Sequence, residues 1–246
     1  MVEKIYEFNF NGHEIYAIGN LEGVNKTVVL FMHGIPGDRV DSRRLPVRIA
    51  RLLCNSGIAA LRIDLYATSF SRGDYEEVTL SLYKQCMLFI INSIRDRYSV
   101  SNFILVAFSE AGKVAMKLQS EISVSGICFC NAILAKEENV DELSVNRFYR
   151  KKSNFVVDIK FGVWININLI KEIRDWCVNK TEFLKNSYLF IYGTGDKMTQ
   201  NTRDMIKNIE GKKILLEQED HLFTSGRNDE RIAHEILTWI CELAVN

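Results

Sequence analysis

The feature that most constrains the fold is a series of short, uninterrupted apolar runs that alternate with segments of helical periodicity. The clearest runs are TVVLFM at 27–32, IAALRI at 58–63 and NFILVAF at 102–108. Strands that are apolar on both faces are typical of a parallel sheet that is covered on both sides. The sequence therefore predicts an α/β fold, with a mostly parallel twisted sheet and helices on both of its faces.

The remaining elements follow the same alternation. We predict strands at 3–9, 13–19, 27–32, 58–63, 102–108, 125–130, 186–192 and 212–217, and helices at 41–56, 78–98, 110–121, 199–208 and 229–243. The first two strands form a hairpin with a turn at Asn11-Gly12.

Residues 132–186 interrupt this rhythm. The stretch FVVDIKFGVWINI at 155–167 predicts a hairpin that turns near 160–162, and a short helix is expected around 168–178. We interpret this segment as a cap insertion over the carboxyl edge of the sheet. The expected organisation is one domain over residues 1–246, with a cap at about 132–186.

Composition excludes several classes of protein. The 31 basic residues equal the 31 acidic residues, so the net charge favours neither nucleic acid nor an anionic membrane surface. No apolar run approaches the 18 residues of a membrane span, and the N-terminal segment lacks the apolar core of a signal peptide. A cytoplasmic location is expected, and the six cysteines are predicted to be mostly buried free thiols. Cys128 and Cys130 form the one close pair, which offers too few ligands for a metal site, so neither a metal nor another cofactor is expected.

Chemistry is expected where polar residues follow the strands, because ligands collect at the carboxyl ends of a parallel sheet. The residues in these positions are His33, Asp64, Ser109, Asp196 and His221. Ser109, Asp196 and His221 occur in the chain order of a nucleophile, its acid and its base. His221 would take the proton of Ser109, and Asp196 would orient the histidine ring.

Two backbone groups are predicted to stabilise a negatively charged oxygen. Ser109 leads directly into a predicted helix, so the N–H of Glu110 would point at the reacting oxygen. The second donor would be the N–H of Ile35 in the loop HGIPG, where the glycines allow a close approach to substrate.

These motifs make most of the chain resemble the α/β-hydrolase superfamily, and more specifically the small cinnamoyl- or feruloyl-esterase-type hydrolases. The stretch RIDLYATSFSRGDYEEVTL at 62–80 is similar in place and general shape to a D-x-R-G-H-G-x-S-x-G loop of that group. The small cap and the separations of Ser109 from Asp196 and His221 also resemble it. The resemblance implies a serine esterase that cleaves a carboxylic ester through an acyl-enzyme, with no metal.

The chain departs from that family in two places. In VAFSEAGKVA, Ala107 and Ala111 stand where G-x-S-x-G has glycines. Alanine is small enough for a tight turn, whose strain is expected to fall on Ser109 with a positive φ. LYATSFS lacks the family's R-G-H-G, so the 64–74 loop is expected to differ in shape. This favours, as an alternative, an acyl-thioesterase or acyltransferase that uses the same triad, and a non-catalytic binding module is a third hypothesis.

Other residues compete for these roles. Asp64, Glu219 and Asp220 are alternatives to Asp196, and the Glu110 side chain is expected to be exposed. His33 is interpreted as structural, whereas His13 and His234 lie in the hairpin and on the last helix. The substrate is expected to be a small acyl ester or thioester, with neither nucleic acid nor membrane as a partner. The residues expected to bind this substrate are Tyr66, Tyr149, Phe155 and Trp164.

Overall fold

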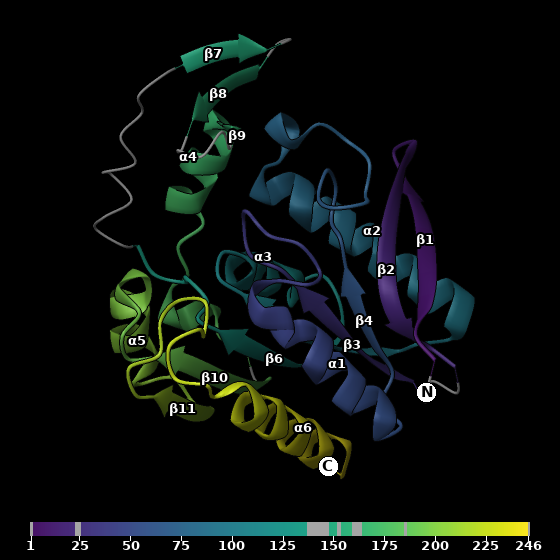
Figure 1. Cartoon of the computed structure of the whole chain (residues 1–246), viewed down its shortest axis with the longest axis vertical. Coiled ribbons are helices and arrows are strands. Elements are labelled where there is room, and N and C mark those ends of the chain that lie inside the picture. The colour runs from purple at the N-terminus through teal and green to yellow at the C-terminus, as the bar shows by residue number, and fades with distance from the viewer. Residues whose placement is uncertain are drawn as a thin grey trace.

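The computed structural model describes residues 2–22, 26–136, 148–151, 154–158, 164–184 and 186–245. For 148–151, 154–158 and 244–245 it describes the backbone alone. The described chain forms an eight-stranded sheet in the order β1-β2-β4-β3-β5-β6-β10-β11, and a separate three-stranded sheet in the order β7-β8-β9 (Figure 1).

The strands of the large sheet are β1 Lys4–Phe10, β2 His13–Asn20, β3 Thr27–Met32, β4 Ala60–Ile63, β5 Asn102–Phe108, β6 Val124–Cys130, β10 Ser187–Gly193 and β11 Lys212–Leu216. The α-helices are α1 Leu45–Asn55, α2 Leu80–Tyr98, α3 Ala111–Leu118, α4 Ile167–Asp175, α5 Gln200–Ile206 and α6 Asp229–Val245. The predicted mostly parallel α/β sheet is confirmed: β1 and β2 pair antiparallel, as do β2 and β4, and the other neighbours pair parallel.

The strand order reverses direction at the centre of the sheet. From β3 the chain crosses to β4 on one side, and from β4 it crosses back to β5 on the other side of β3. Neighbouring crossovers that leave in opposite directions open a crevice at the carboxyl ends of the two strands. The loop after β3 and the loop after β5 therefore meet at this point.

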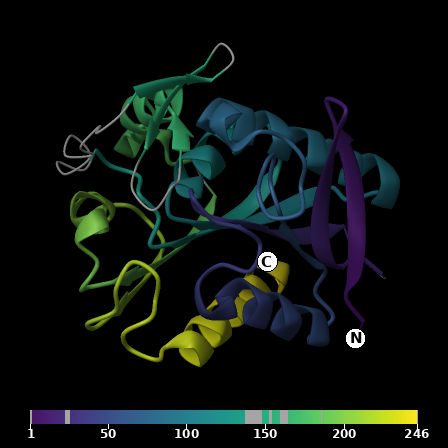
Figure 2. The same cartoon turned by 45° about the horizontal axis from the view of Figure 1, so that its top comes forward.

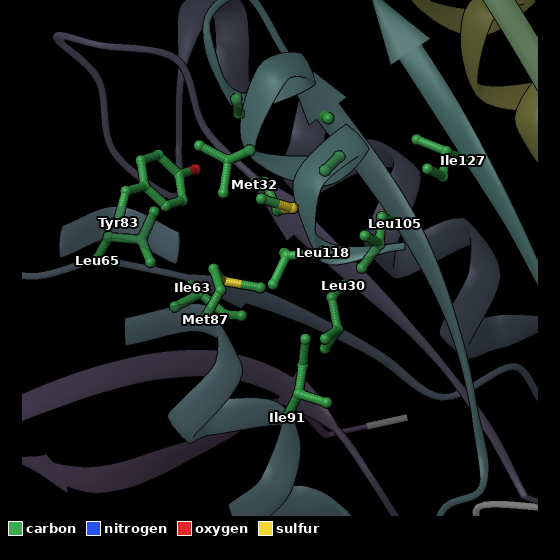
Figure 3. Packing of buried hydrophobic residues seen from close by; sticks show 14 of the residues in the cluster. Leu30, Met32, Ile63, Leu65, Tyr83, Met87, Ile91, Leu105, Leu118 and Ile127 are labelled. Atoms are coloured by element: carbon green, nitrogen blue, oxygen red, sulfur yellow. The ribbon is translucent and has the colours of Figure 1, made fainter. Parts of the chain in front are cut away.

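The sheet separates two hydrophobic layers, because successive side chains on a strand point to opposite faces. On β5, Phe103, Leu105 and Ala107 belong to the layer under α2 and α3, whereas Ile104, Val106 and Phe108 belong to the layer under α1 and α6. Figure 2 shows α1 and α6 together on one face of the sheet and α2 on the other. In Figure 3, Leu30 and Met32 of β3 lie in the same cluster as Met87 and Ile91 of α2.

The segment predicted to be a cap, residues 132–186, is called the cap segment and lies in the chain between β6 and β10 (Figure 1). Its described part contains the antiparallel strands β7 Phe148–Lys151, β8 Asn154–Asp158 and β9 Trp164–Asn166, followed by α4. The predicted pairing of β8 with β9 is confirmed, whereas the position of their turn lies outside the described residues. Strand β7 was not predicted, because its sequence, FYRK, carries two basic residues and no alternation long enough to recognise.

The predicted helix at 41–56 is wrong at its beginning. α1 begins at Leu45, where Pro46 lies in the first turn, and residues 42–44 form a short 3-10 turn. Asp41, Arg43 and Arg44 have φ values of 51°, 50° and 60°. Left-handed backbone at three positions prevents a regular helix there.

Candidate active site

Ser109 occupies a sharp turn between β5 and α3. Its φ is +50°, as expected for a serine held between a strand and a helix. The turn is fixed from both sides, because the Ser109 N–H donates to the Cys130 carbonyl at 3.3 Å and its carbonyl accepts from the Gly112 N–H at 3.1 Å. A residue other than glycine keeps a strained backbone conformation only where the surrounding structure fixes it.

The small residues around Ser109 are explained by packing. Ala107 and Ala111 are fully buried. A Cβ on Gly112 would lie 2.6 Å from the Ala132 Cβ and 2.9 Å from Leu134 Cδ2, so helix α3 packs closely on the chain that leaves β6. Alanine therefore satisfies the two flanking positions, and the requirement for glycine falls on Gly112.

The loop after β3 lies against the serine. A Cβ on Gly34 would lie 2.9 Å from the Ser109 Cβ and 3.6 Å from Ser109 Oγ. The backbone of Gly34 and Ile35 therefore passes next to the hydroxyl, and both residues line the same cavity as Ser109. The other predicted donor, the N–H of Glu110, lies directly before the first residue of α3.

Ser109, His221 and Asp196 form a continuous hydrogen-bonded chain. His221 Nε2 lies 2.9 Å from Ser109 Oγ, and His221 Nδ1 lies 2.7 Å from Asp196 Oδ2. Because a carboxylate accepts, Nδ1 carries the proton and Nε2 is left to accept from the serine hydroxyl. Asp196 is buried, and its two oxygens also accept from the Met198 N–H at 2.8 Å and the Thr199 hydroxyl at 2.9 Å.

The loops that carry Asp196 and His221 are held together by backbone contacts. A Cβ on Gly193 would lie 2.3 Å from the Glu219 carbonyl oxygen, so only glycine fits this crossing. Thr194 N–H donates to the Leu216 carbonyl at 2.9 Å, and Gln218 N–H donates to Thr194 Oγ1 at 3.0 Å. The two loops after β10 and β11 therefore form one unit.

Asn131 joins this unit to the central sheet, and the sequence analysis missed it. It directly follows β6 and is buried. Its Nδ2 donates to the carbonyls of Asp220 and His221, both at 2.9 Å, and its Oδ1 accepts from the Gly193 N–H at 2.8 Å. The sequence did point to Asn131, because it is a polar residue that directly follows a predicted strand, as Ser109 does.

A cavity of about 320 Å³ opens beside Ser109 and His221. Its size falls within the range of small-molecule sites. Its described lining residues are Gly34, Ile35, Pro36, Asp41, Ser42, Leu45, Pro46, Phe108, Ser109, Cys130, Met198, His221, Leu222 and Phe223. Most of the wall is apolar, and the exposed side chains of Met198 and Leu222 extend it to the surface.

The competing acids have other partners. Asp64 is fully buried, forms an ion pair with Arg39 and accepts from the Arg39 N–H at 2.9 Å. Glu219 accepts from the Ser225 N–H at 3.1 Å, and Asp220 accepts from the Thr224 N–H at 2.7 Å. These carboxylates hold loops, and Asp196 is the acid that meets the His221 ring.

His33 is buried at the base of the loop after β3. Its Nδ1 lies 2.7 Å from the Gly34 carbonyl, and its Nε2 accepts from the Leu65 N–H at 3.3 Å. Burial lowers the pKa of His33 to about 4. A neutral ring with a protonated Nδ1 fits both partners, so His33 supports the loop, as expected.

The expectation that the Glu110 side chain is exposed was wrong. Glu110 is buried and forms an ion pair with Lys113 at 2.8 Å, where both side chains are nearly inaccessible. The Lys113 ammonium also donates to the Ile173 carbonyl of α4 at 2.7 Å. The pair therefore connects the helix after Ser109 to the cap segment. The sequence does not reveal this arrangement, because the contact of Lys113 with Ile173 joins residues 60 positions apart.

The predicted substrate-binding residues are not among the described residues that line the cavity. Tyr66 is buried, its hydroxyl donates to Glu77, and its ring lies where a Cβ on Gly73 would be. It lines a smaller space of about 10 Å³ together with Gly34 and Ile35, and its role in substrate binding stays a prediction. Trp164 begins β9 and is half-buried. Tyr149 and Phe155 lie on β7 and β8, and their side chains lie outside the described part of the structure.

A metal site and a membrane-spanning helix are two further features that a chain of this length could carry. Within the described residues, no three side chains among His, Cys, Asp and Glu are arranged to hold a metal ion. Cys128 and Cys130 are buried free thiols whose sulfurs are 3.7 Å apart. None of the helices in the described part of the chain has both the length and the apolar character needed to cross a bilayer.

Comparison with solved structures identifies the class of fold. Est1E from Butyrivibrio proteoclasticus with bound ferulic acid has a TM-score of 0.79 at 15% identity, over 98% of this chain and 100% of that one. Mouse alpha/beta hydrolase domain-containing protein 10 has a TM-score of 0.70 at 17% identity, over 98% and 99% of the two chains. The haloalkane dehalogenase DatA from Agrobacterium tumefaciens C58 has a TM-score of 0.68 at 14% identity, over 98% and 97%.

The chain therefore has the α/β-hydrolase fold, and it resembles esterases of that fold. No family model and no curated protein sequence matches it. Because the similar structures include an esterase and a dehalogenase, the reaction has to be argued from the site itself.

Proposed function

We propose that the protein is a serine hydrolase that cleaves a carboxylic ester through an acyl-enzyme. The observation that carries this proposal is the chain of hydrogen bonds from Ser109 Oγ through His221 to Asp196, at 2.9 and 2.7 Å, beside a largely apolar cavity. A serine hydroxyl needs an adjacent base to act as a nucleophile, and the base needs a group that fixes its tautomer. The chain supplies each of these groups.

The proposed reaction begins with attack of Ser109 Oγ on the ester carbonyl. His221 Nε2 takes the hydroxyl proton, while Asp196 stabilises the imidazolium that forms. The oxyanion of the tetrahedral intermediate accepts hydrogen bonds from the N–H groups of Ile35 and Glu110. His221 then returns the proton to the leaving alcohol, and an acyl group remains on Ser109.

Hydrolysis of the acyl-enzyme completes the cycle. Water donates a proton to His221 Nε2 and attacks the acyl carbonyl, which passes through a second oxyanion in the same place. The proton returns to Ser109 Oγ as the carboxylic acid leaves. Every step uses protons that His221 takes up and returns, and the product is one acid and one alcohol.

The test is hydrolysis of p-nitrophenyl butyrate by the wild type and by Ser109→Ala. The proposal requires Ser109-dependent turnover, with a loss of at least about 10³-fold in kcat/KM in the variant. A thioester of the same acid is assayed in parallel, because it forms the same acyl-enzyme. Equal activity of the wild type and Ser109→Ala on both substrates would refute the proposal.

A further inference from the structure

Asp41 and Ser42 line the cavity and belong to a segment, residues 38–44, that has an unusual backbone. Asp41 has φ 51° and ψ −171°, a conformation that is almost confined to glycine. Arg43 and Arg44 also have positive φ. The turn is fixed by Asp38, whose carboxylate accepts from the N–H groups of Val40 at 2.7 Å and Asp41 at 3.1 Å. In this conformation Asp41 lines the cavity.

Among the described residues, no Lys, Arg or His side chain forms an ion pair with the Asp41 carboxylate. Its Oδ1 accepts from the Ser42 N–H at 2.5 Å. The guanidinium of Arg43, two residues further on, contacts Asp229 at 3.5 Å and the Thr224 carbonyl at 3.2 Å instead. Burial raises the pKa of Asp41, although the Ser42 N–H and His221 lower it. Ionised Asp41 is therefore poorly compensated by the protein.

The other residues of the cavity do not offset the negative charge of Asp41. Asp41 is the only carboxylate among the described lining residues, and most of its neighbours there are apolar, including Leu45, Met198 and Phe223. A neutral apolar ligand that expelled water would leave the carboxylate desolvated without a partner, which is costly. A ligand with a positive charge would supply that partner and would still fill the apolar space.

We propose that Asp41 is the specificity-determining residue of this site and selects esters that carry a cationic group. The inference rests on the proposed function, because it concerns the substrate of the same Ser109. The substrate would have an apolar portion against the cavity wall and a positive charge placed next to Asp41. The contact adds binding energy that a neutral ester of the same shape lacks.

The test compares esters that have the same shape and differ in charge. On the acyl side, p-nitrophenyl 6-(trimethylammonio)hexanoate is paired with p-nitrophenyl 7,7-dimethyloctanoate. On the alcohol side, butyrylcholine is paired with 3,3-dimethylbutyl butyrate. The readout is the ratio of kcat/KM for the cationic ester to that for the neutral ester, measured at pH 8.

For the wild type, at least one pair should give a ratio of about 10 or more, and Asp41→Asn should lower that ratio by about 10-fold. Asp41→Glu should keep the preference, because it keeps the charge. Glu217→Gln is the matched control, since Glu217 is an exposed acid outside the cavity and should leave the ratio unchanged.

Two results overturn the inference. A wild-type ratio near 1 for both pairs would do so without any variant, so the test does not depend on the folding of Asp41→Asn. A high ratio that Asp41→Asn leaves unchanged would do so as well. In both cases the protein still hydrolyses the neutral esters in a Ser109-dependent manner, so the proposed function is retained. If no ester is hydrolysed in a Ser109-dependent manner, the proposed function fails and this inference fails with it.

Discussion

Ser109 and His221 are 112 positions apart in the chain, yet Ser109 Oγ and His221 Nε2 lie 2.9 Å apart. The contact depends on three strands, because Ser109 directly follows β5, Asn131 directly follows β6, and the loop after β11 carries His221. The hydrogen bonds from Asn131 to the loop carbonyls bring the histidine to the centre of the sheet. The sheet and its loops therefore fix the position of the base relative to the nucleophile.

Asp196→Asn should lower kcat for ester hydrolysis by about 10³- to 10⁴-fold with little change in KM. An amide can present its N–H₂ to His221, which favours the wrong tautomer and leaves the imidazolium without a negative charge. Steady-state kinetics on an aryl ester measures both constants. Asp220→Asn is the comparison, because Asp220 precedes His221 in the chain and holds its loop through Thr224. If the Asp220 variant loses more activity than the Asp196 variant, the assignment of the acid is wrong.

Asn131→Ala should lower kcat by about 10- to 100-fold and change KM by less than about 3-fold. The variant loses the hydrogen bonds to Gly193, Asp220 and His221 that position the acid and the base, whereas substrate contacts remain. Asn20→Ala is the matched control, since Asn20 is also buried and hydrogen-bonded, to Val2 and Glu22, but belongs to β2. Both variants should lose stability, and only Asn131→Ala should lose kcat. Equal kcat values for the two would show that Asn131 is merely structural.

Lys113→Met should lower the free energy of unfolding by about 3–5 kcal/mol, because it leaves the buried Glu110 carboxylate without its cation. Glu110→Gln combined with Lys113→Met should recover part of that loss. The measurement is denaturant unfolding of the single and double variants. Lys207→Met provides the control, since Lys207 forms an ion pair of the same spacing with Asp204 on the surface, and no measurable loss is expected there. A double variant that is less stable than Lys113→Met alone would contradict the account of the buried pair.

The pKa of His33, which burial lowers to about 4 from 6.5, predicts how stability depends on pH. Between these values the unfolded chain binds a proton that the folded protein does not, so folding stability rises with pH across this window. The contribution is fully present above pH 6.5 and falls by up to about 3 kcal/mol as the pH drops to 4. Unfolding of the wild type and His33→Gln from pH 4.5 to 7.5 tests this. The stability advantage of the wild type should shrink towards low pH, and a constant difference would refute the prediction.

The sequence was sufficient to predict the sheet, which depends on local patterns, and to select Ser109, Asp196 and His221 by their places after strands. NFILVAF at 102–108 can only be a strand that is buried on both faces, and polar residues at strand ends have to meet at one edge of a parallel sheet. Ser109 could therefore be identified even though alanines replace the flanking glycines.

The features that the sequence analysis missed depend on contacts between distant segments. The spacing of Leu45, Ile49 and Leu53 suggests a helix that includes Asp41, and it does not show that the backbone at 41–44 turns left-handed against the cavity. The buried Glu110 pairs with Lys113, which contacts Ile173 in a distant segment of the chain. The sequence also does not show that the ring of Tyr66 fills the space above Gly73.

Covalent labelling shows whether Ser109 is a nucleophile that His221 activates. The wild type is incubated with a p-nitrophenyl alkylphosphonate, and its intact mass and the modified peptide are measured. We predict a single phosphonyl adduct on Ser109, no adduct in Ser109→Ala, and labelling at least about 100-fold slower in His221→Ala. Labelling at another residue, or at the same rate in Ser109→Ala, would contradict the account.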